Sequence, residues 1–146
     1  MGARGTLRFI DSNIFLHAYL TPRRALTRAE QTVKDEAKAV VKRVEEGEEV
    51  ATTVVHVSEV VNVIETGLGI QESLGFLAWI IASENVKVYP VSPKDYANTL
   101  LIAREKDISV NDALAYLFMK AHGIKEIYSF DKHFKKLEDI ITLPKI

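Results

Sequence analysis

The chain alternates between short runs of consecutive apolar residues and longer segments in which apolar residues recur at helical spacing. Short runs bounded by polar or turn-forming residues are typical of buried strands, whereas recurrence every three or four residues is typical of amphipathic helices. The runs predict strands at residues 7–10, 50–55, 86–91, 127–130 and 140–143. The helical spacing predicts helices at residues 14–19, 28–46, 57–67, 71–83, 93–106 and 109–122.

The order of these elements predicts the fold class. Strands that alternate with helices indicate an α/β fold whose mainly parallel sheet is covered on both faces. Pro90 falls inside the third strand, and proline cannot donate to a central ladder, so this strand is expected at an edge of the sheet. With 146 residues, no internal repeat and no linker-like stretch, residues 1–146 are expected to form a single domain.

The helix predicted at residues 71–83 differs from the others because it is apolar on nearly every side. Its large apolar residues include Leu74, Phe76, Leu77, Trp79, Ile80 and Ile81. A helix of this kind is either enclosed in the core or covered by a partner. Part of it is therefore a candidate dimer face, and a homodimer is the expected assembly.

The composition narrows the class of protein. Hydrophobic residues make up 47% and charged residues 27%, which is ordinary for a globular protein. The absence of cysteine excludes disulfides and thiolate-bound zinc or iron–sulfur clusters. The net charge of −1 means that affinity for nucleic acid has to come from local patches. No apolar run reaches the roughly 18 residues of a membrane span, and residues 1–5 lack the apolar core of a secretory signal, so a cytoplasmic location is expected.

Four acidic residues fall at equivalent places in the predicted topology. Asp11 directly follows the first strand, and Glu59 lies in the first turns of the helix after the second strand. Asp112 lies near the start of the helix that leads into the fourth strand, and Asp131 follows that strand. Functional groups of open α/β sheets gather beyond the carboxyl ends of the strands. The four carboxylates are therefore expected to converge at one edge of the sheet.

Each of these acids also has a structural explanation. Asp11 can cap the helix that follows it. Ser109 and Asp112 approximate a capping box, Glu59 can be a solvated helix residue, and Asp131 can serve in a turn. Four unrelated structural roles would have to fall by chance at one edge of the sheet. We therefore favour the interpretation that the four acids form one shared site.

The chemistry of such a cluster limits its function. Four neighbouring carboxylates repel one another, so some would be protonated unless a cation lies among them. Oxygen ligands favour Mg²⁺ or Mn²⁺ over zinc. Metal ions held in this way commonly activate water and stabilise charge on phosphate oxygens. The sequence therefore favours metal-dependent hydrolysis of phosphodiester bonds.

Four segments, taken together, resemble the PIN-domain nuclease family and in particular VapC-type toxin ribonucleases. Residues 9–15 resemble the opening block, in which a strand ends in Asp11 followed by Ser and Asn. Residues 58–61 resemble the second acidic block around Glu59. Residues 110–115 resemble the third, in which Asp112 precedes alanine, and residues 128–134 resemble the fourth, which ends in Ser-x-Asp at Asp131. The segments occur in the family order and span nearly the whole chain.

The resemblance implies a three-layer α/β/α sandwich with strand order 3-2-1-4-5. It implies that Asp11 and Asp112 are the principal ligands of a Mg²⁺ or Mn²⁺ ion, that Glu59 completes the site, and that Asp131 binds metal or orients water. All four would then be catalytic residues. Asn13 and Ser129 would support the acids by hydrogen bonds. The implied activity is an endoribonuclease, either the toxin of a toxin–antitoxin pair with a small antitoxin partner or an enzyme of RNA processing.

Other polar residues have plainer interpretations. His17 and His56 are expected to be structural, and His133 is expected to be solvated near Asp131. Two basic stretches are candidates to hold an RNA backbone, although runs of charge are more often solvated surfaces. They consist of Arg23, Arg24 and Arg28 after the first helix, and Lys132, Lys135 and Lys136 beside the fourth acid.

Two functional alternatives remain beside the nuclease. A PIN-like module could bind RNA or protein without cleaving it, although the presence of all four acids favours catalysis. A haloacid-dehalogenase-like phosphotransferase or a receiver domain would also begin with an acid after the first strand. The phosphotransferase needs a second acid where this chain has Asn13. The receiver domain needs paired acids after the first strand and a phosphorylatable aspartate after a middle strand. Neither pattern is present.

Overall fold

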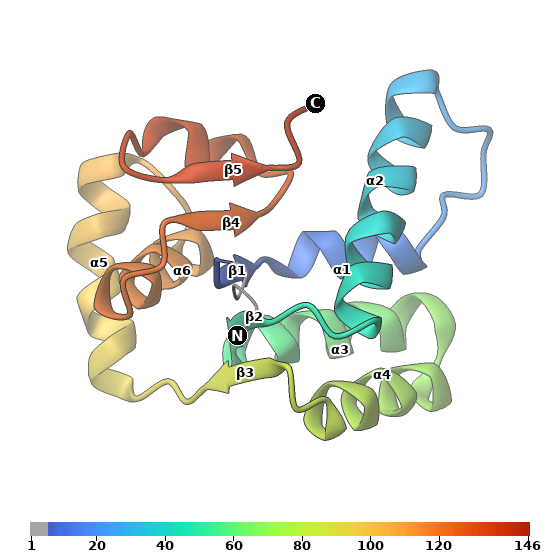
Figure 1. Ribbon diagram of the computed structural model, residues 1–146, viewed down its shortest axis with the longest axis horizontal. Helices are drawn as coiled ribbons and strands as arrows, with labels where there is room; N and C mark the ends of the chain where they lie inside the picture. The colour runs from blue at the N-terminus through green and yellow to red at the C-terminus, as the bar shows by residue number, and fades with distance from the viewer. Residues whose placement is uncertain (1–5) are drawn as a thin grey trace.

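The computed structural model describes residues 6–146, and the segment 1–5 considered above for a secretory signal lies outside that range. Its centre is a five-stranded sheet in which every neighbouring pair of strands is parallel (Figure 1). The strands are β1 (Arg8–Ile10), β2 (Val50–Thr53), β3 (Val86–Tyr89), β4 (Glu126–Tyr128) and β5 (Ile141–Leu143). Their order is β3-β2-β1-β4-β5, so the expected α/β topology is confirmed.

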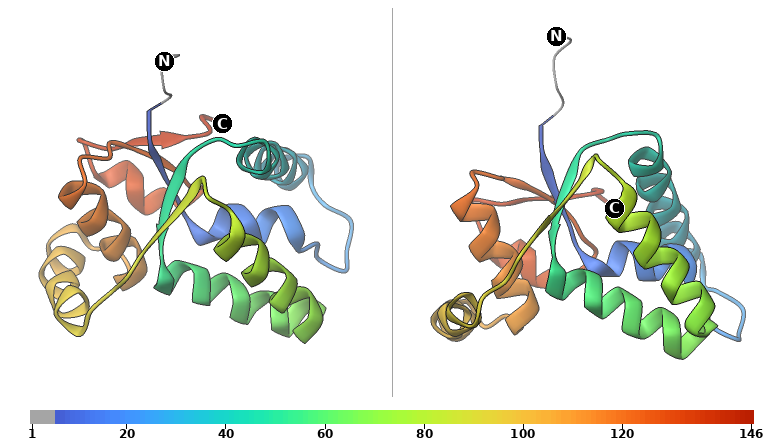
Figure 2. Two further views of the ribbon diagram at one scale, coloured as in Figure 1. Left: turned by 60° about the horizontal axis from the view of Figure 1, so that its bottom comes forward. Right: turned by 90° about the horizontal axis from the view of Figure 1, so that it is seen from below.

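Helices cover both faces of the sheet and complete a three-layer sandwich (Figure 2). One face carries α1 (Ser12–Tyr19), α2 (Arg28–Glu45), α3 (Val54–Leu68) and α4 (Ile70–Ala82). The other carries α6 (Val110–Ala121) and the short 3-10 helix η1 (Lys132–Lys136), with α5 (Pro93–Lys106) packed against α6. The central strand β2 is buried at every residue, whereas the edge strands β3 and β5 each have an exposed residue.

Successive strand residues feed two separate hydrophobic cores. Phe9 points to the core beneath α6 and η1, whereas Ile10 points to the core beneath α1–α4. Ala51 and Val50 divide between the same two cores in the same way. Side chains of a strand alternate between its faces, so even a three-residue strand anchors both layers.

The hydrophobic pattern misplaces several element boundaries, and the largest difference lies between the second strand and the helix that follows it. The second strand ends at Thr53, and Val54 and Val55 belong to α3 rather than to the strand. The Thr53 hydroxyl accepts the backbone N–H of His56 at 3.2 Å, which makes Thr53 the N-cap of α3. β-branched residues alone could not show this, because the cap residue decides where the helix begins. The expected edge position of the third strand is confirmed, since β3 ends the sheet, but the strand stops at Tyr89 and Pro90 lies just beyond it rather than inside it.

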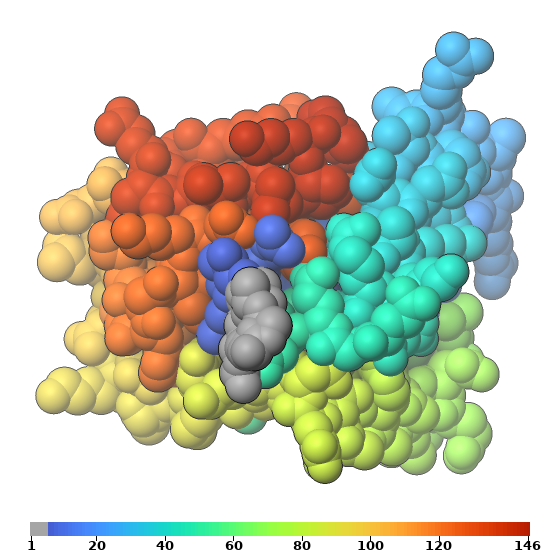
Figure 3. Space-filling model, viewed as in Figure 1, coloured from blue at the N-terminus to red at the C-terminus, as the bar shows by residue number. Residues whose placement is uncertain are grey.

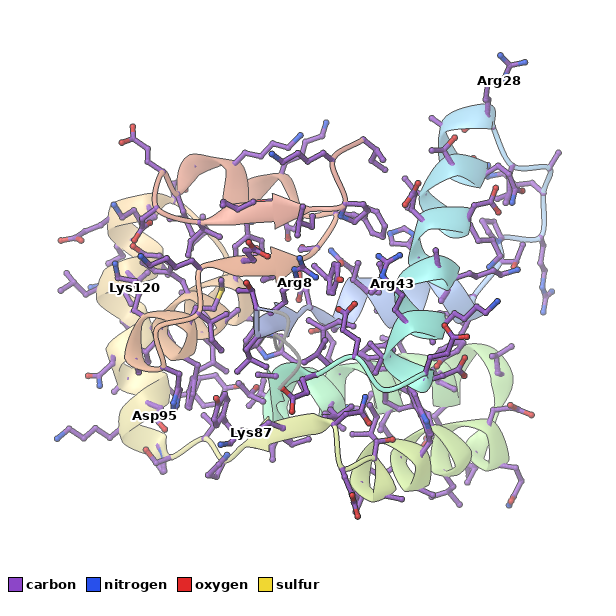
Figure 4. The ribbon with its side chains drawn as sticks, in the orientation of Figure 1. Arg8, Arg28, Arg43, Lys87, Asp95 and Lys120 are labelled. Carbon is purple, nitrogen blue, oxygen red and sulfur yellow. The ribbon has the colours of Figure 1, made fainter. Side chains whose placement is uncertain are left out.

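Aromatic and charged side chains bind β1, β4 and α2 together away from the acids. The Tyr128 hydroxyl donates to Glu48 at 2.6 Å and accepts from Arg8 at 3.0 Å. The guanidinium groups of Arg8 and Arg43 lie 5.4 and 5.7 Å from the centre of the Tyr128 ring, and both converge on this region in Figure 4. Arg8 also pairs with Glu126 at 2.6 Å. These charges are engaged in holding the fold.

The outer side of α4 is apolar and exposed, as a partner-covered helix would be. Phe76 and Ile80 are buried against the sheet, whereas Leu74 is 51% and Ile81 is 73% exposed. The helix is therefore neither enclosed nor amphipathic. Across residues 6–146, none of the helices has the length and apolar character that a membrane crossing requires.

Candidate metal centre

Asp11 lies at the carboxyl end of β1, where the strand turns into α1. Its backbone N–H donates to the carbonyl of Tyr128 at 3.0 Å, which continues the β1–β4 ladder by one residue. Its carboxylate accepts the backbone N–H of Ser12 at 2.8 Å and so caps α1. The capping role considered from the sequence is therefore real, and only 4% of Asp11 is exposed. One carboxylate oxygen remains directed toward β4.

Ser129, the residue after β4, holds that second oxygen. Its hydroxyl donates to Asp11 Oδ2 at 2.7 Å and accepts the backbone N–H of Asp131 at 3.0 Å. Asn13 approaches the same hydroxyl at 3.4 Å and accepts the N–H of Phe130 at 3.2 Å. Ser129 and Asn13 thus join the ends of β1 and β4, the supporting position expected for them.

Asp112, Asp131 and His133 form the tightest group of potential ligands. One ligand atom from each lies within 4.8 Å of the other two. His133 Nδ1 lies 2.7 Å from Asp112 Oδ2 and 3.4 Å from Asp131 Oδ1. The Asp131 carboxylate also accepts the backbone N–H of His133 at 2.9 Å, which caps η1 and fixes the turn. Asp112 is nearly buried and Asp131 is partly open, so the group faces solvent on the Asp131 side.

Glu59 approaches the cluster from α3 and is held through one oxygen. The Ser12 hydroxyl donates to Glu59 Oε1 at 2.9 Å, and the Asn111 amide donates to the same oxygen at 3.1 Å. Both donors are direct neighbours of the acids Asp11 and Asp112. Glu59 is therefore tied to the ends of β1 and α6, with Oε2 left for another partner.

His56 lies beneath this linkage with both ring nitrogens in use. Nε2 is 3.0 Å from the carbonyl of Asn111, and Nδ1 is 2.7 Å from the Thr53 hydroxyl. Because a carbonyl can only accept, Nε2 carries the proton and Nδ1 accepts from Thr53. Burial lowers the pKa of His56 to about 4, so the ring stays neutral. His56 therefore has a specific structural role. It holds Asn111, which precedes Asp112 in the sequence and donates a hydrogen bond to Glu59.

Two of the acids resist ionisation. Burial raises the pKa of Asp11 to about 6, and the charges of Glu59 and Asp131 add to the effect against the hydrogen bond from Ser129. Burial likewise raises the pKa of Asp112 to about 7, with contributions from Asp131 and Asp11, while His133 opposes the shift. Both raised pKa values have the cause expected of crowded carboxylates in a low-dielectric environment. A cation placed among the carboxylates would favour their ionised form and so oppose the rise in pKa.

The donor set fits a divalent cation. Asp112 and Asp131 supply oxygen ligands, Asp11 adds negative charge behind them, and His133 can supply an imidazole nitrogen. Carboxylate oxygens suit Mg²⁺ and Mn²⁺, and a nitrogen ligand is better accepted by Mn²⁺ than by Mg²⁺. His133 instead contacts Asp112 here, so it either becomes a ligand or moves aside when a cation binds.

The structure brings the four expected acids to one edge of the sheet, but not into one equal group. Asp112 and Asp131 share the metal-sized cluster, whereas Asp11 and Glu59 are linked to it through hydroxyl and amide groups. The sequence interpretation treated His133 as solvated and overlooked its contact with Asp112. Its backbone N–H donates to the N-cap residue Asp131, but the sequence pattern does not fix the direction of its ring toward Asp112. Ser12 and Asn111 were also overlooked, although both lie inside the motif blocks.

The parallel sheet covered by helices makes this chain an α/β protein. The buried carboxylates beyond the ends of its strands form a candidate metal centre. The profile of the PIN domain matches residues 8–140. The chain belongs to the PIN-domain family. No curated protein sequence matches it.

Solved structures with the same fold come from several bacteria. VapC20 of Mycobacterium tuberculosis, described as a toxin that cleaves the sarcin–ricin loop, is similar with a TM-score of 0.67 and 20% identity over 91% of this chain and 95% of that one. A toxin–antitoxin complex from Klebsiella pneumoniae is similar with a TM-score of 0.62 and 16% sequence identity, covering 97% of this chain and 100% of that one. VapBC2 of Rickettsia felis, bound to a DNA fragment from its promoter, is similar with a TM-score of 0.62 and 13% sequence identity, covering 94% of this chain and 97% of that one. At these identities the likeness shows a shared fold.

The position of His56 leads to a prediction about the site above it. His56→Leu keeps the volume of the side chain but leaves the Asn111 carbonyl and the Thr53 hydroxyl without their buried partner. We expect the free energy of unfolding to fall by about 2–4 kcal/mol. We also expect Mn²⁺ affinity to fall at least about tenfold, since groups that orient ligands typically contribute that much.

Urea denaturation and titration calorimetry with Mn²⁺ measure the two effects. His17→Leu is the matched control, because exposed His17 contacts the Phe130 ring and none of the acids. Unchanged Mn²⁺ affinity in His56→Leu would show that His56 does not hold the Asn111–Glu59 linkage in place.

Proposed function

We propose that this protein is a single-domain, Mg²⁺- or Mn²⁺-dependent endoribonuclease of the VapC type. The observation that carries the proposal is geometric: Asp11 and Asp112 are buried at one edge of the sheet, and Asp112 offers a ligand atom within 4.8 Å of ligand atoms from Asp131 and His133. Membership of the PIN-domain family supports nuclease chemistry at this cluster. The bound metal would polarise the scissile phosphate and lower the pKa of an attacking water.

The residues around the cluster have distinct roles in this proposal. Asp112 and Asp131 hold the cation, and Asp11 keeps its negative charge close behind them. Ser129 fixes Asp11 and Asp131 at once through a single hydroxyl. Glu59 is anchored by Oε1 alone, so Oε2 is available to accept a proton from water. The partly open side at Asp131 admits the substrate.

We further propose that the protein acts as a toxin whose partner is a small antitoxin. The similar structures include toxin–antitoxin complexes from Klebsiella pneumoniae and Rickettsia felis, which supports this assignment. An antitoxin would neutralise the enzyme by covering the open side of the acid cluster. A homodimer remains our expectation, and the exposed apolar side of α4 is available for either contact.

Cleavage of RNA tests the enzymatic part of the proposal. We expect a labelled single-stranded RNA to be cut in Mg²⁺ or Mn²⁺, and the activity to be lost in EDTA and in Asp11→Asn. Asp139→Asn is the matched control, because Asp139 lies on the surface with Lys120 at 2.6 Å. Cleavage that survives both EDTA and Asp11→Asn would refute the proposal. RNA binding without cleavage at millimolar metal would instead identify a binding module.

A further inference from the structure

A pocket of about 560 Å³ opens directly beside the acid cluster. Its lining includes Ser129 and Asp131 after β4, two lysines of η1, and residues 144–146 after β5. Val33 of α2 completes the lining, and in Figures 1 and 3 the red C-terminal segment runs up to α2. This volume lies within the range of about 300–1,000 Å³ that small-molecule and cofactor sites occupy.

Positive charge surrounds the mouth of this pocket. Lys132, Lys135 and Lys145 all line it, and all three are exposed. Within residues 6–146, none of these ammonium groups pairs with a carboxylate. Uncompensated lysines beside a carboxylate cluster favour a ligand that is anionic at one end and reaches a metal at the other. A nucleic-acid backbone has that arrangement of charge.

Three of the other basic residues considered from the sequence are engaged or directed elsewhere. Lys136 donates to the carbonyl of Asp107 at 2.8 Å, and Arg24 forms two hydrogen bonds with Glu30 at 2.8 and 2.7 Å. Arg28 projects from the far tip of α2 in Figure 4. Lys145, which the sequence interpretation overlooked, takes the place of Lys136 beside the acids.

The wall of the pocket is largely apolar, which a phosphate alone does not require. Phe130 and Pro144 both contribute to this apolar lining. Phe130 and Val33 also line a second pocket of about 330 Å³, which continues toward Pro22 and Leu26 in the segment between α1 and α2. The two pockets therefore form one depression that leads away from Asp131 past the Phe130 ring. Aromatic rings in basic grooves bind single strands by stacking on their bases.

We infer that this depression binds single-stranded RNA next to the cleaved bond, with backbone phosphates on Lys132, Lys135 and Lys145 and a base against Phe130. The inference rests on the proposed nuclease function for the identity of the ligand. A duplex would keep its bases stacked and could not place one against Phe130. Recognition at this position therefore selects unpaired RNA.

Binding without cleavage tests the inference separately from the enzymatic activity. A fluorescein-labelled 12-nucleotide oligouridine is titrated with the full-length protein in EDTA, and the anisotropy is followed between 50 and 200 mM salt. We expect the triple variant Lys132→Ala, Lys135→Ala, Lys145→Ala to bind at least about tenfold more weakly. Its slope of log K against log salt should be smaller by about 2, since each phosphate contact on a single strand contributes about 0.7.

The matched control removes the same charge from exposed lysines that do not line the pocket. Lys94, Lys106 and Lys125 are exposed and do not line the pocket, so their triple alanine variant is expected to change affinity less than about twofold. Phe130→Leu should weaken binding about fivefold or more without changing the salt slope. Excess duplex RNA should compete poorly.

Each outcome decides between the two ideas. Equal losses in the two lysine triples would overturn the inference, as would competition by duplex as effective as that by single strand. A selective loss in the Lys132–Lys135–Lys145 variant, together with a wild-type protein that never cleaves, would uphold the RNA pocket and reject the proposed enzyme. Cleavage by a wild-type protein whose affinity ignores these lysines would do the reverse.

Discussion

Replacing Asp112 with asparagine is expected to lower metal-dependent RNA cleavage by about 1,000-fold, because the variant loses a charged ligand from the centre of the cluster. Single-turnover cleavage of a labelled RNA in Mn²⁺ measures the effect. Asparagine has the same shape and can still accept the hydrogen bond from His133. A variant that cuts RNA within tenfold of the wild-type rate would remove Asp112 from the proposed site.

The same substitution is expected to stabilise the metal-free protein at alkaline pH. The pKa of Asp112 is about 7 in the folded protein and 3.8 in an unfolded chain, so the folded state binds the proton more tightly. Stability therefore falls as pH rises through this window and stays low above it. Asp112→Asn carries no such charge and should exceed the wild type by about 2–4 kcal/mol at pH 8. Near pH 4 the difference should disappear.

Urea denaturation in EDTA at pH 4 and pH 8 measures this difference. Asp139→Asn again serves as control, because hydrogen bonding and charge from Lys120 lower the pKa of Asp139 and the substitution should be slightly destabilising at pH 8. If Asp112→Asn were less stable than the wild type at pH 8, the carboxylate would not be the source of strain that its raised pKa indicates. A gain in stability with a loss of activity would mark Asp112 as a functional residue.

Metal affinity is expected to fall about 1,000-fold between pH 8 and pH 5. At pH 5 the medium is two units below the pKa of Asp112 and one unit below that of Asp11, so the cation has to displace protons from this interacting pair. Above pH 7 both carboxylates are ionised and affinity should level off. Calorimetric titration with Mn²⁺ across this range gives the profile.

Asp112→Asn provides the internal comparison for this profile. It should bind Mn²⁺ weakly at every pH and lose only about tenfold in affinity between pH 8 and pH 5, since only Asp11 still titrates. Proton release on metal binding, measured in buffers of different ionisation enthalpy, should be largest near pH 6. A wild-type affinity that is the same at pH 5 and pH 8 would contradict the assignment of these two acids.

Much of the fold could be predicted because local preferences and topology agree. The alternation of strands and helices indicated a parallel sheet, and the strand order implied by the family resemblance places β3 at its edge. The boundary at Thr53 could not be predicted from hydrophobicity, because Val54 and Val55 suit a strand as well as a helix. There the N-cap hydrogen bond decides the outcome, and threonine is common in strands too.

The candidate site was predictable in position but not in its contacts. That acids follow β1 and β4 indicates where Asp11 and Asp131 lie, since carboxyl ends of parallel strands share an edge. The hydrogen bonds that arrange them depend on side chains whose direction the pattern does not fix. His133 was assigned to solvent because it lies in a basic, polar stretch, yet the turn of η1 directs its ring to Asp112. Lys145 escaped notice because it is remote in sequence from the acids.

The hydrogen bond between Ser129 and Asp11 joins residues 118 positions apart. Synthesis at about 5–20 residues per second separates them by roughly ten seconds. Until β4 inserts beside β1, Asp11 lacks the hydroxyl that fixes its second oxygen, and Asp131 does not yet lie beside Asp112. A nascent chain therefore carries no assembled site. The proposed ribonuclease therefore cannot cut RNA before β4 has been synthesised and has paired with β1.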